Sequence, residues 1–308
     1  MITMLSTLIL SMACSDTDAN GGGGAQAATP DPFSGEQALA YVKEQLDFGP
    51  RVPGSEAHRK TGDWIVQMMK ARADTVIEQR WDHTAADGKV LPLRNVFARF
   101  RPEATERVLY VTHWDTRPRS DNARDPEQKL LPVPGANDGA SGTAMLIALG
   151  DVLKQTPPAV GVDFLCVDGE DYGEFGPPEV DVLLGAKYFA EHPLVADYTP
   201  LFGVLWDMIG DRDLKFEKEA NSMRGAPEVV ARVWEQANAL GYGSVFVPTE
   251  GIGITDDHIP LLKVGIRVIN VIDLDFKWHH TPDDTIDKIS AASLKIVGDV
   301  ALALVTAR

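Results

Sequence analysis

Four short apolar runs, each followed by acidic or histidine side chains, constrain the fold of this chain more than any other feature. The runs are RVLYVTHWD, VDFLCVDGED, LFGVLWDMIG and IRVINVIDLD, and their polar residues include His113, Asp115, Glu170, Asp171 and Asp207. Segments with helical periodicity lie between or beside them, at 139–154, 183–191, 227–240 and 290–306. This repeating order predicts an open, mostly parallel α/β sheet whose functional site lies at the carboxyl ends of its strands.

The segment ahead of these runs predicts two helices and a hairpin in the same domain. Ser34 and Gln37 form a capping box before a helix that ends at Gly49-Pro50, and a second helix is expected over 56–73. Two alternating strands follow, joined at an Asp87-Gly88 turn. Because no linker or repeat interrupts the pattern, we expect a single catalytic domain over 34–308.

Residues 1–33 have a different character. MITMLSTLILSMAC is a short apolar segment that ends in small residues, and a Gly/Ala/Asp-rich stretch follows it. Together they resemble a bacterial lipoprotein leader and tether, with cleavage behind Ala13 and a lipid on Cys14. The resemblance implies an exported protein, periplasmic or at the outer surface, that touches a membrane only through this anchor. An ordinary secreted chain or a misassigned start is the alternative.

The net charge limits the kinds of partner, and sequence context predicts the surroundings of the second cysteine and of four histidines. A formal net charge of −16 argues against a nucleic-acid partner, because phosphate backbones are held by Lys/Arg patches. Cys166 lies in an apolar run, so we expect a buried core thiol. His58, His83 and His192 lie outside the polar clusters and are expected to face solvent, while His258 is expected to pack at a helix start.

The side chains at the strand ends suit a metal. Asp, Glu and His without a thiolate are the oxygen and nitrogen ligands of catalytic zinc sites, which keep one coordination position open. A single carboxylate at a strand end is usually a helix cap or a solvated loop residue. A set on four strands that converge at one crevice predicts a metal site instead.

Six motifs carry a resemblance to a known family. HWDTRP, GANDGASG, DGEDYG, DMIGD, DDHIPLLKVGI and WHHTPDD follow one another between Gly49 and the C-terminus. In this order they resemble the M28 zinc-peptidase superfamily, in its bacterial glutaminyl cyclase branch. The resemblance implies a three-layer αβα fold of the phosphorylase/hydrolase-like type, with a mixed twisted sheet between helical layers.

The same resemblance implies residue roles. Asp138, Asp171 and His280 match zinc ligands, and Glu170 matches the general base. His279 is expected to be a neighbour of the ligand, in the loop or around it. From their position alone, Asp283 and Asp284 are expected to cap the turn into the last helix and to orient a ligand by a hydrogen bond to that ligand.

Three features favour a cyclase over an aminopeptidase of this superfamily. Fourteen positions separate Asp171 from Gly185, which resembles a loop insertion of cyclases. Trp278 precedes the histidine pair and is expected to bind substrate by walling a glutamine pocket. Asp256 matches a residue that cyclases pair with the one at Asp207, and we expect the two to be hydrogen-bonded and catalytic.

The predicted activity is therefore a zinc-dependent glutaminyl-peptide cyclotransferase, which converts N-terminal glutamine to pyroglutamate with release of ammonia. Its partners would be peptides or proteins that begin with glutamine, and its cofactor one Zn2+ ion. The alternative is an M28 aminopeptidase with two zinc ions, the second held by His113 and Asp207. A metal-free binding module is a third possibility, but such a module would have lost ligands, and here every candidate ligand is present.

Overall fold

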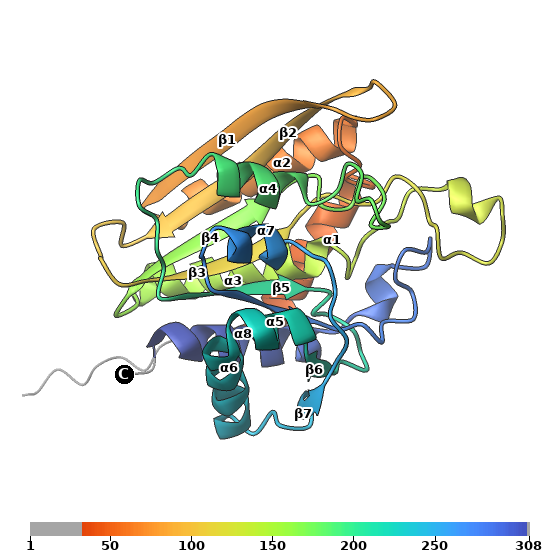
Figure 1. The fold of residues 1–308 in the computed structure, drawn as a ribbon. Coiled ribbons are helices and arrows are strands. Elements are labelled where there is room, and N and C mark those ends of the chain that lie inside the picture. Colours follow the sequence, from red (N-terminus) through yellow and green to blue (C-terminus); the bar gives the residue numbers. More distant parts are fainter. Residues whose placement is uncertain (1–32, 307–308) are drawn as a thin grey trace, which may run out of the picture.

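A computed structural model describes residues 33–306, and its centre is a six-stranded mixed sheet (Figure 1). The strand order is β1-β2-β4-β3-β5-β8. Pairing is antiparallel between β1 and β2 and between β2 and β4, and parallel across β4, β3, β5 and β8. The strand bounds are β1 Thr75–Thr84, β2 Val90–Phe100, β3 Arg107–His113, β4 Gly161–Val167, β5 Phe202–Asp207 and β8 Val268–Ile272. The prediction of a mostly parallel sheet preceded by a hairpin is confirmed.

Alternating residues of the central strands point into two different helical layers. In β3, Val108 and Tyr110 pack in the core formed with α1, α2, α3, α6 and α8, whereas Leu109 and Val111 pack in a second core with α4 and α7. Every residue of β3, β4 and β5 is buried, as a sheet covered on both faces requires. The three-layer αβα prediction is therefore confirmed.

The helices follow the expected segments closely. Their bounds are α1 Gly35–Asp47, α2 Glu56–Lys70, α3 Ala140–Gln155, α4 Leu184–Glu191, α5 Ala220–Gly225, α6 Pro227–Ala239, α7 His258–Lys263 and α8 Ala291–Thr306. Ser34 caps α1 by accepting a hydrogen bond from the Gln37 backbone N–H at 3.1 Å, as predicted. The second helix ends three residues earlier than expected, because Thr75 already pairs with Arg99 in the hairpin.

Three short elements complete the chain. A small parallel sheet joins β6 Phe216–Lys218 to β7 Phe246–Glu250, and two 3-10 turns lie at η1 Gln128–Leu130 and η2 Ile286–Lys288. Sequence analysis did not predict the small sheet, because its strands are only three and five residues long. The predicted leader and tether fall almost entirely outside the described residues. None of the helices between residues 33 and 306 has the length and apolar character needed to cross a bilayer.

The prediction that His58 faces solvent is wrong. Its side chain is buried, stacks on Trp114 with ring centroids 4.4 Å apart, and places Nε2 2.8 Å from Asp168 Oδ1. The physical reason is helical periodicity: position 58 shares the inward face of α2 with Thr61 and Ile65. His83 is also partly buried, with Nε2 2.7 Å from Asp181, whereas His192 is exposed as expected.

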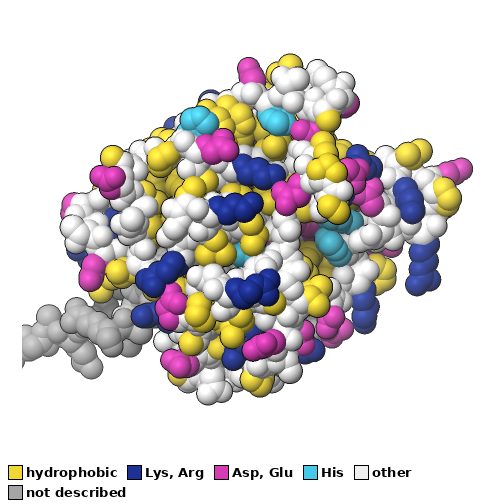
Figure 2. All heavy atoms as spheres, in the orientation of Figure 1, with side chains coloured by type: hydrophobic (Ala, Val, Ile, Leu, Met, Phe, Trp, Pro, Cys, Tyr) yellow, Lys and Arg dark blue, Asp and Glu magenta, His cyan; other side chains and the backbone are white. Residues whose placement is uncertain are grey.

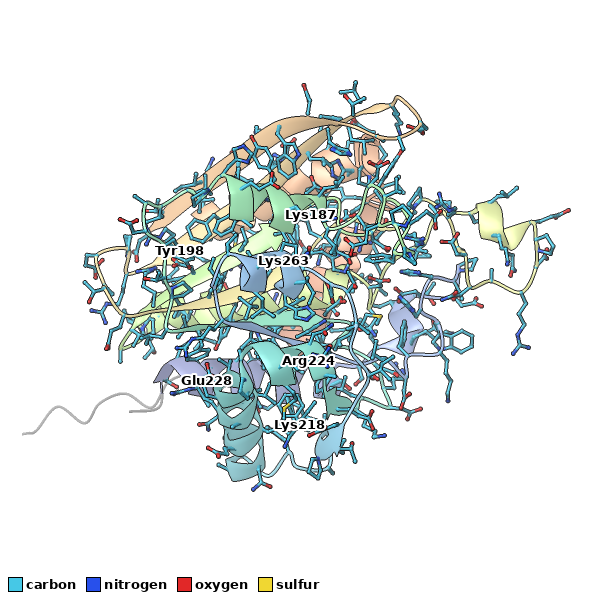
Figure 3. All side chains as sticks on the ribbon, in the orientation of Figure 1. Lys187, Tyr198, Lys218, Arg224, Glu228 and Lys263 are labelled. Atoms are coloured by element: carbon cyan, nitrogen blue, oxygen red, sulfur yellow. The ribbon has the colours of Figure 1, made fainter. Side chains whose placement is uncertain are left out.

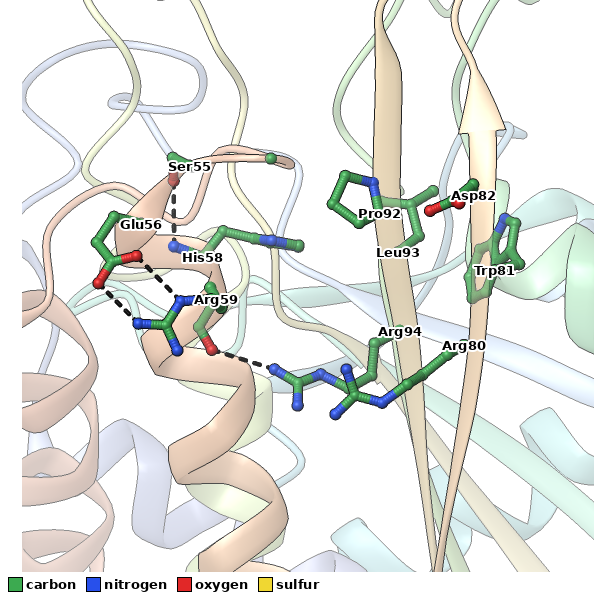
Figure 4. Close-up of a pocket in the computed structure, with 11 residues that line it drawn as sticks. Ser55, Glu56, His58, Arg59, Arg80, Trp81, Asp82, Pro92, Leu93 and Arg94 are labelled. Atoms are coloured by element: carbon green, nitrogen blue, oxygen red, sulfur yellow. Dashed lines mark hydrogen bonds and ion pairs between the residues drawn. The ribbon is translucent and has the colours of Figure 1, made fainter.

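A hollow of about 530 Å³ lies beside His58, between the start of α2 and the β1–β2 hairpin (Figure 4). It contains none of the predicted site residues. Arg59, which lines it, is paired with Glu56 at 2.7 Å, and Arg94 is paired with Asp63 at 2.8 Å. Since these charges are already matched, the hollow does not compete with the strand ends as a functional site.

The amino-terminal ends of the parallel strands are sealed by a satisfied ionic cluster. Asp163 of β4 accepts hydrogen bonds from Arg99 at 3.0 Å, from Arg107 at 2.7 Å and from the Tyr198 hydroxyl at 2.8 Å. Figure 3 labels Tyr198 at this end of the sheet, away from the projecting segment that contains η1. Cys166 of the same strand is buried, and burial raises the pKa of its thiol to about 12, so the prediction of an inert core thiol is confirmed.

Candidate active site

The carboxyl ends of the parallel strands open into a cavity of about 430 Å³. Figure 2 shows histidine side chains exposed on this side of the molecule, beside the projecting segment. The residues that reach the cavity come from the ends of different elements, as expected for an α/β sheet. The predicted site residues that line it are Asp138, Glu170, Asp207, Asp256 and His280.

One group of ligand atoms surrounds His280. Its Nε2 lies 3.2 Å from Asp171 Oδ1 and 3.5 Å from Asp138 Oδ2. The Oδ2 atoms of both aspartates are buried, and neither has a hydrogen-bond partner. A buried carboxylate oxygen without a partner is costly, so these orphaned atoms fit a bound cation. Sequence analysis selected these three residues as the ligands, and the fold brings them together.

His279 belongs to this group as well. Its Nε2 lies 3.9 Å from Asp138 Oδ2, and Asp138, His279 and His280 each offer a ligand atom within 4.8 Å of the others. His280 has φ of 52°, in the left-handed region that non-glycine residues seldom adopt, and the two imidazole centroids are 3.7 Å apart. The sequence placed His279 only as a neighbour. Its position directly before His280 was the signal available for a closer role.

A second group shares Asp138. His113 Nε2 lies 3.1 Å from Asp138 Oδ1 and 3.2 Å from Asp207 Oδ1. Asp138 therefore presents one oxygen to each group. Although burial opposes ionisation, His113 and His280 hold the pKa of Asp138 below its usual range. This arrangement has the ligand types expected for a second metal.

Glu170 is held at the cavity by its backbone. The N–H groups of Glu170 and Asp171 donate to the two oxygens of Asp115, at 3.1 and 3.2 Å. Burial raises the pKa of Glu170 well above its ordinary range, opposed by His113 and reinforced by Asp171. A buried carboxyl of this kind can both take up and return a proton near neutral pH.

The expected hydrogen bond between Asp207 and Asp256 is not formed. Asp256 accepts instead from Asn270 Nδ2 at 2.6 Å and from the Asp257 backbone N–H at 2.5 Å. The turn into α7 and strand β8 supply these donors, which occupy both carboxylate oxygens. Burial and then the charge of Asp207 raise the pKa of Asp256 well above its ordinary range. The two carboxylates are therefore linked by charge through the cavity and not by a direct bond.

Trp278 does not wall the cavity, contrary to expectation. Its ring packs beside the apolar cluster of Met208, Ile272 and Phe276, and it lines a neighbouring hollow. The apolar wall of the cavity is provided by residues that the sequence did not assign to it, which are Phe175, Met208, Ile254, Ile272 and Leu274. These residues belong to loops and strand ends, so their shared location depends on the tertiary fold.

Hydrogen bonds from Arg51 hold the turn that carries Asp138 in place. This buried guanidinium donates to the carbonyl oxygens of Pro134 at 2.5 Å, Gly135 at 2.7 Å and Trp114 at 3.4 Å. Burial lowers the pKa of Arg51 to about 10, against the raising effect of Asp284 and other nearby carboxylates, so it stays charged at neutral pH.

Asp284 holds the same turn from the other side. It accepts the backbone N–H groups of Asn137 at 2.8 Å and of Asp138 at 3.1 Å. Of the two aspartates expected to orient a ligand, Asp284 has this role, because it fixes the backbone of Asp138. Asp283 is exposed.

We predict that Arg51→Met weakens zinc binding about 10- to 100-fold, because the Pro134 and Gly135 carbonyls of the Asp138 turn lose the donor that also ties them to the Trp114 carbonyl. Equilibrium dialysis with elemental analysis measures this affinity, and circular dichroism checks the fold. Arg59→Met, on the exposed surface of α2, is the matched control and should bind zinc as the unaltered protein does. Unchanged zinc affinity in a folded Arg51→Met protein would contradict the assignment.

Comparison with known proteins identifies the family of the chain. Residues 95–305 match Peptidase family M28. The chain is 28% identical over 211 residues to aminopeptidase YwaD of Bacillus subtilis, covering 64% of this chain but only 40% of that protein. It is 29% identical over 283 residues to the glutaminyl-peptide cyclotransferase of Drosophila melanogaster, covering 82% of this chain and 76% of that protein.

A solved structure matches over nearly the full described length. The glutaminyl cyclase of Bacteroides thetaiotaomicron, bound to N-acetylhistamine, superposes with a TM-score of 0.87 at 35% identity, covering 91% of this chain and 100% of that one. The resemblance to the glutaminyl cyclase branch is thus confirmed in sequence and in structure. The chain belongs to peptidase family M28.

Proposed function

We propose that this protein is a zinc-dependent glutaminyl-peptide cyclotransferase. The observation that carries the proposal is the segment after Asp171, which lines one side of the cavity with Glu174, Phe175 and Gly176. Glu174 and Val180 pair with each other through two backbone hydrogen bonds of 2.8 and 2.9 Å. Asp181 anchors the segment by accepting the Ala86 backbone N–H at 2.7 Å. An apolar wall that keeps water from the reacting atoms favours attack by the substrate's own amine over attack by water.

The chain's residues have defined places in this reaction. Asp138, Asp171 and His280 would hold one zinc ion, with His279 beside them, and zinc would supply Lewis acidity toward the side-chain amide carbonyl of an N-terminal glutamine. Asp207 and Asp256 line the same cavity and would hold the substrate's α-ammonium or amine. Phe175 and Ile254 would exclude water as part of the cavity wall, where sequence analysis expected Trp278.

Glu170 is the proposed acid–base group. It would take a proton from the α-amine as that nitrogen bonds to the side-chain amide carbon. It would then return a proton to the amide nitrogen as the carbon–nitrogen bond breaks. Ammonia leaves, and the five-membered pyroglutamate ring closes the peptide's N-terminus.

We expect Glu170→Gln to lower the rate of ammonia release from a glutamine-initiated peptide by about 100-fold or more, while zinc affinity stays unchanged. An ammonia assay coupled to mass spectrometry detects the lost mass of the peptide. The control is Glu174→Gln, a carboxylate at the exposed rim of the cavity. A Glu170→Gln protein with full activity would sink the assignment of the base.

A second candidate function is a two-zinc aminopeptidase. The group of His113, Asp138 and Asp207 favours it, because Asp138 offers a separate oxygen to each ligand group. In that case Glu170 would take a proton from a water molecule that attacks the first peptide bond, and the cavity would accept an N-terminal side chain.

Zinc stoichiometry and His113→Ala separate the two functions. For a cyclase we expect one zinc per chain, retained in His113→Ala, and no release of leucine from a leucine-initiated peptide. For an aminopeptidase we expect two zinc ions, one lost in His113→Ala together with leucine release. Elemental analysis and amino-acid detection on the same protein samples give both readouts.

The proposed cellular location rests on residues 1–33 alone. We propose an exported protein, periplasmic or at the outer surface, anchored by a lipid on Cys14, and its substrates would be exported peptides or proteins. Mass spectrometry of membrane-extracted protein should then find acylated Cys14 at the mature N-terminus. A mature N-terminus at any other residue would refute the anchor.

A further inference from the structure

A hollow of about 630 Å³ adjoins the active-site cavity. One side of it comes from the segment that projects after β3, with Asn122, Arg124 and Gln128. The other side comes from the loop after β8, with Lys277, Trp278 and Asp283 among its lining residues. Trp278 lines this hollow and does not line the active-site cavity.

Asn122 and the histidine pair form the boundary between the two spaces. Asn122 lines both of them. Its backbone N–H donates to the His280 carbonyl at 3.1 Å, and its Nδ2 donates to the His279 carbonyl at 3.1 Å. The hollow therefore lies next to the space where a substrate residue bound at His280 would sit.

The charged side chains that line the hollow differ in their pairing from those beside the active-site cavity. Arg117 and Arg119, at the cavity rim, are paired with Asp121 and Glu174. Arg124 and Lys277 are exposed, and neither forms a close ion pair with any residue between 33 and 306, although the charge of Lys277 opposes the rise that burial causes in the pKa of Asp211. Asp283 is the one carboxylate among the lining residues, so two cations face one anion there.

An unmatched positive hollow is notable in a chain with a net charge of −16. Trp278 adds an aromatic face, over which Lys288 Nζ sits 4.7 Å from the ring centroid. Lys288 itself is paired with Asp287 at 2.6 Å, so Arg124 and Lys277 supply the positive charge available to a ligand. The exposed cationic side chains of Arg124 and Lys277, beside the apolar ring of Trp278, suit a carboxylate on a flexible chain.

We propose that this hollow binds an acidic side chain located downstream of the substrate's N-terminal residue. This inference rests on the proposed function, since it assigns a residue preference to peptides processed in the cavity. An extended chain advances about 3.3–3.6 Å per residue, and we assign Arg124 and Lys277 to the third and fourth substrate residues, an assignment that a series of peptides tests. The contact lies away from the reacting atoms and should lower KM without changing kcat.

The test uses a series of glutamine-initiated alanine peptides that carry one glutamate or one lysine at positions two to five. We expect glutamate at position three or four to raise kcat/KM about 3- to 10-fold over the all-alanine peptide, through KM, and lysine to lower it. The preference should fade at about 0.5 M salt, because exposed charges are screened there. In the double variant Arg124→Glu with Lys277→Glu, lysine should become the preferred residue.

Lys129→Glu is the matched control, since Lys129 lies on the same projecting segment but does not line the hollow. It should keep the preference for glutamate. If the unaltered protein shows no such preference, or if the preference survives charge reversal at Arg124 and Lys277, the proposal is overturned.

A binding measurement separates this proposal from the proposed activity. Fluorescence anisotropy with the same labelled peptides and the Glu170→Gln variant measures peptide binding at the hollow without turnover. A leucine-initiated series repeats the binding measurement for the case of an aminopeptidase. Acid-selective binding without ammonia release would support the hollow and reject the cyclase. Ammonia release with equal binding of all peptides would support the cyclase and reject the hollow.

Discussion

The carboxylate of Asp138 is the interaction on which the rest of the site depends. One of its oxygens lies 3.1 Å from His113 and the other 3.5 Å from His280, so the residue joins two groups of potential ligands. Its backbone is held by Asp284, and its turn by the buried guanidinium of Arg51. In the sequence, Arg51 precedes strand β1 and Asp284 follows strand β8, the first and last strands of the central sheet. Both residues nevertheless hold the same short turn.

The two ends of the parallel sheet show why one of them is reactive. At the amino-terminal end, Asp163 is buried but has Arg99, Arg107 and Tyr198 as partners, which compensate its charge. At the carboxyl end, Asp138 and Asp171 each keep a buried oxygen without a partner. These unsatisfied oxygens, grouped with His279 and His280, fit a bound cation, whereas the cluster around Asp163 is complete without one.

Much of the fold and part of the site could be predicted from local patterns. Apolar runs fixed the strands, helical periodicity and Ser34 fixed the helix starts, and the motifs identified Asp138, Asp171 and His280, which the structure brings together. The errors have a common origin in contacts between distant segments. His58 lies on the inward face of α2, where the distant residues Asp168 and Trp114 contact it, and Asp256 is bonded to Asn270 because α7 packs beside β8.

The sequence by itself determined the order of strands and helices, the family and the residue types at the strand ends, because these depend on periodicity and spacing along the chain. Only the tertiary structure decided which side chains line the same cavity or hollow. It placed Trp278 in the hollow beside Arg124 and Lys277, and it put Phe175 and Ile254 in the wall of the cavity. The physical reason is that loops are positioned by the elements they connect, and their side chains carry no periodicity that reveals where they point.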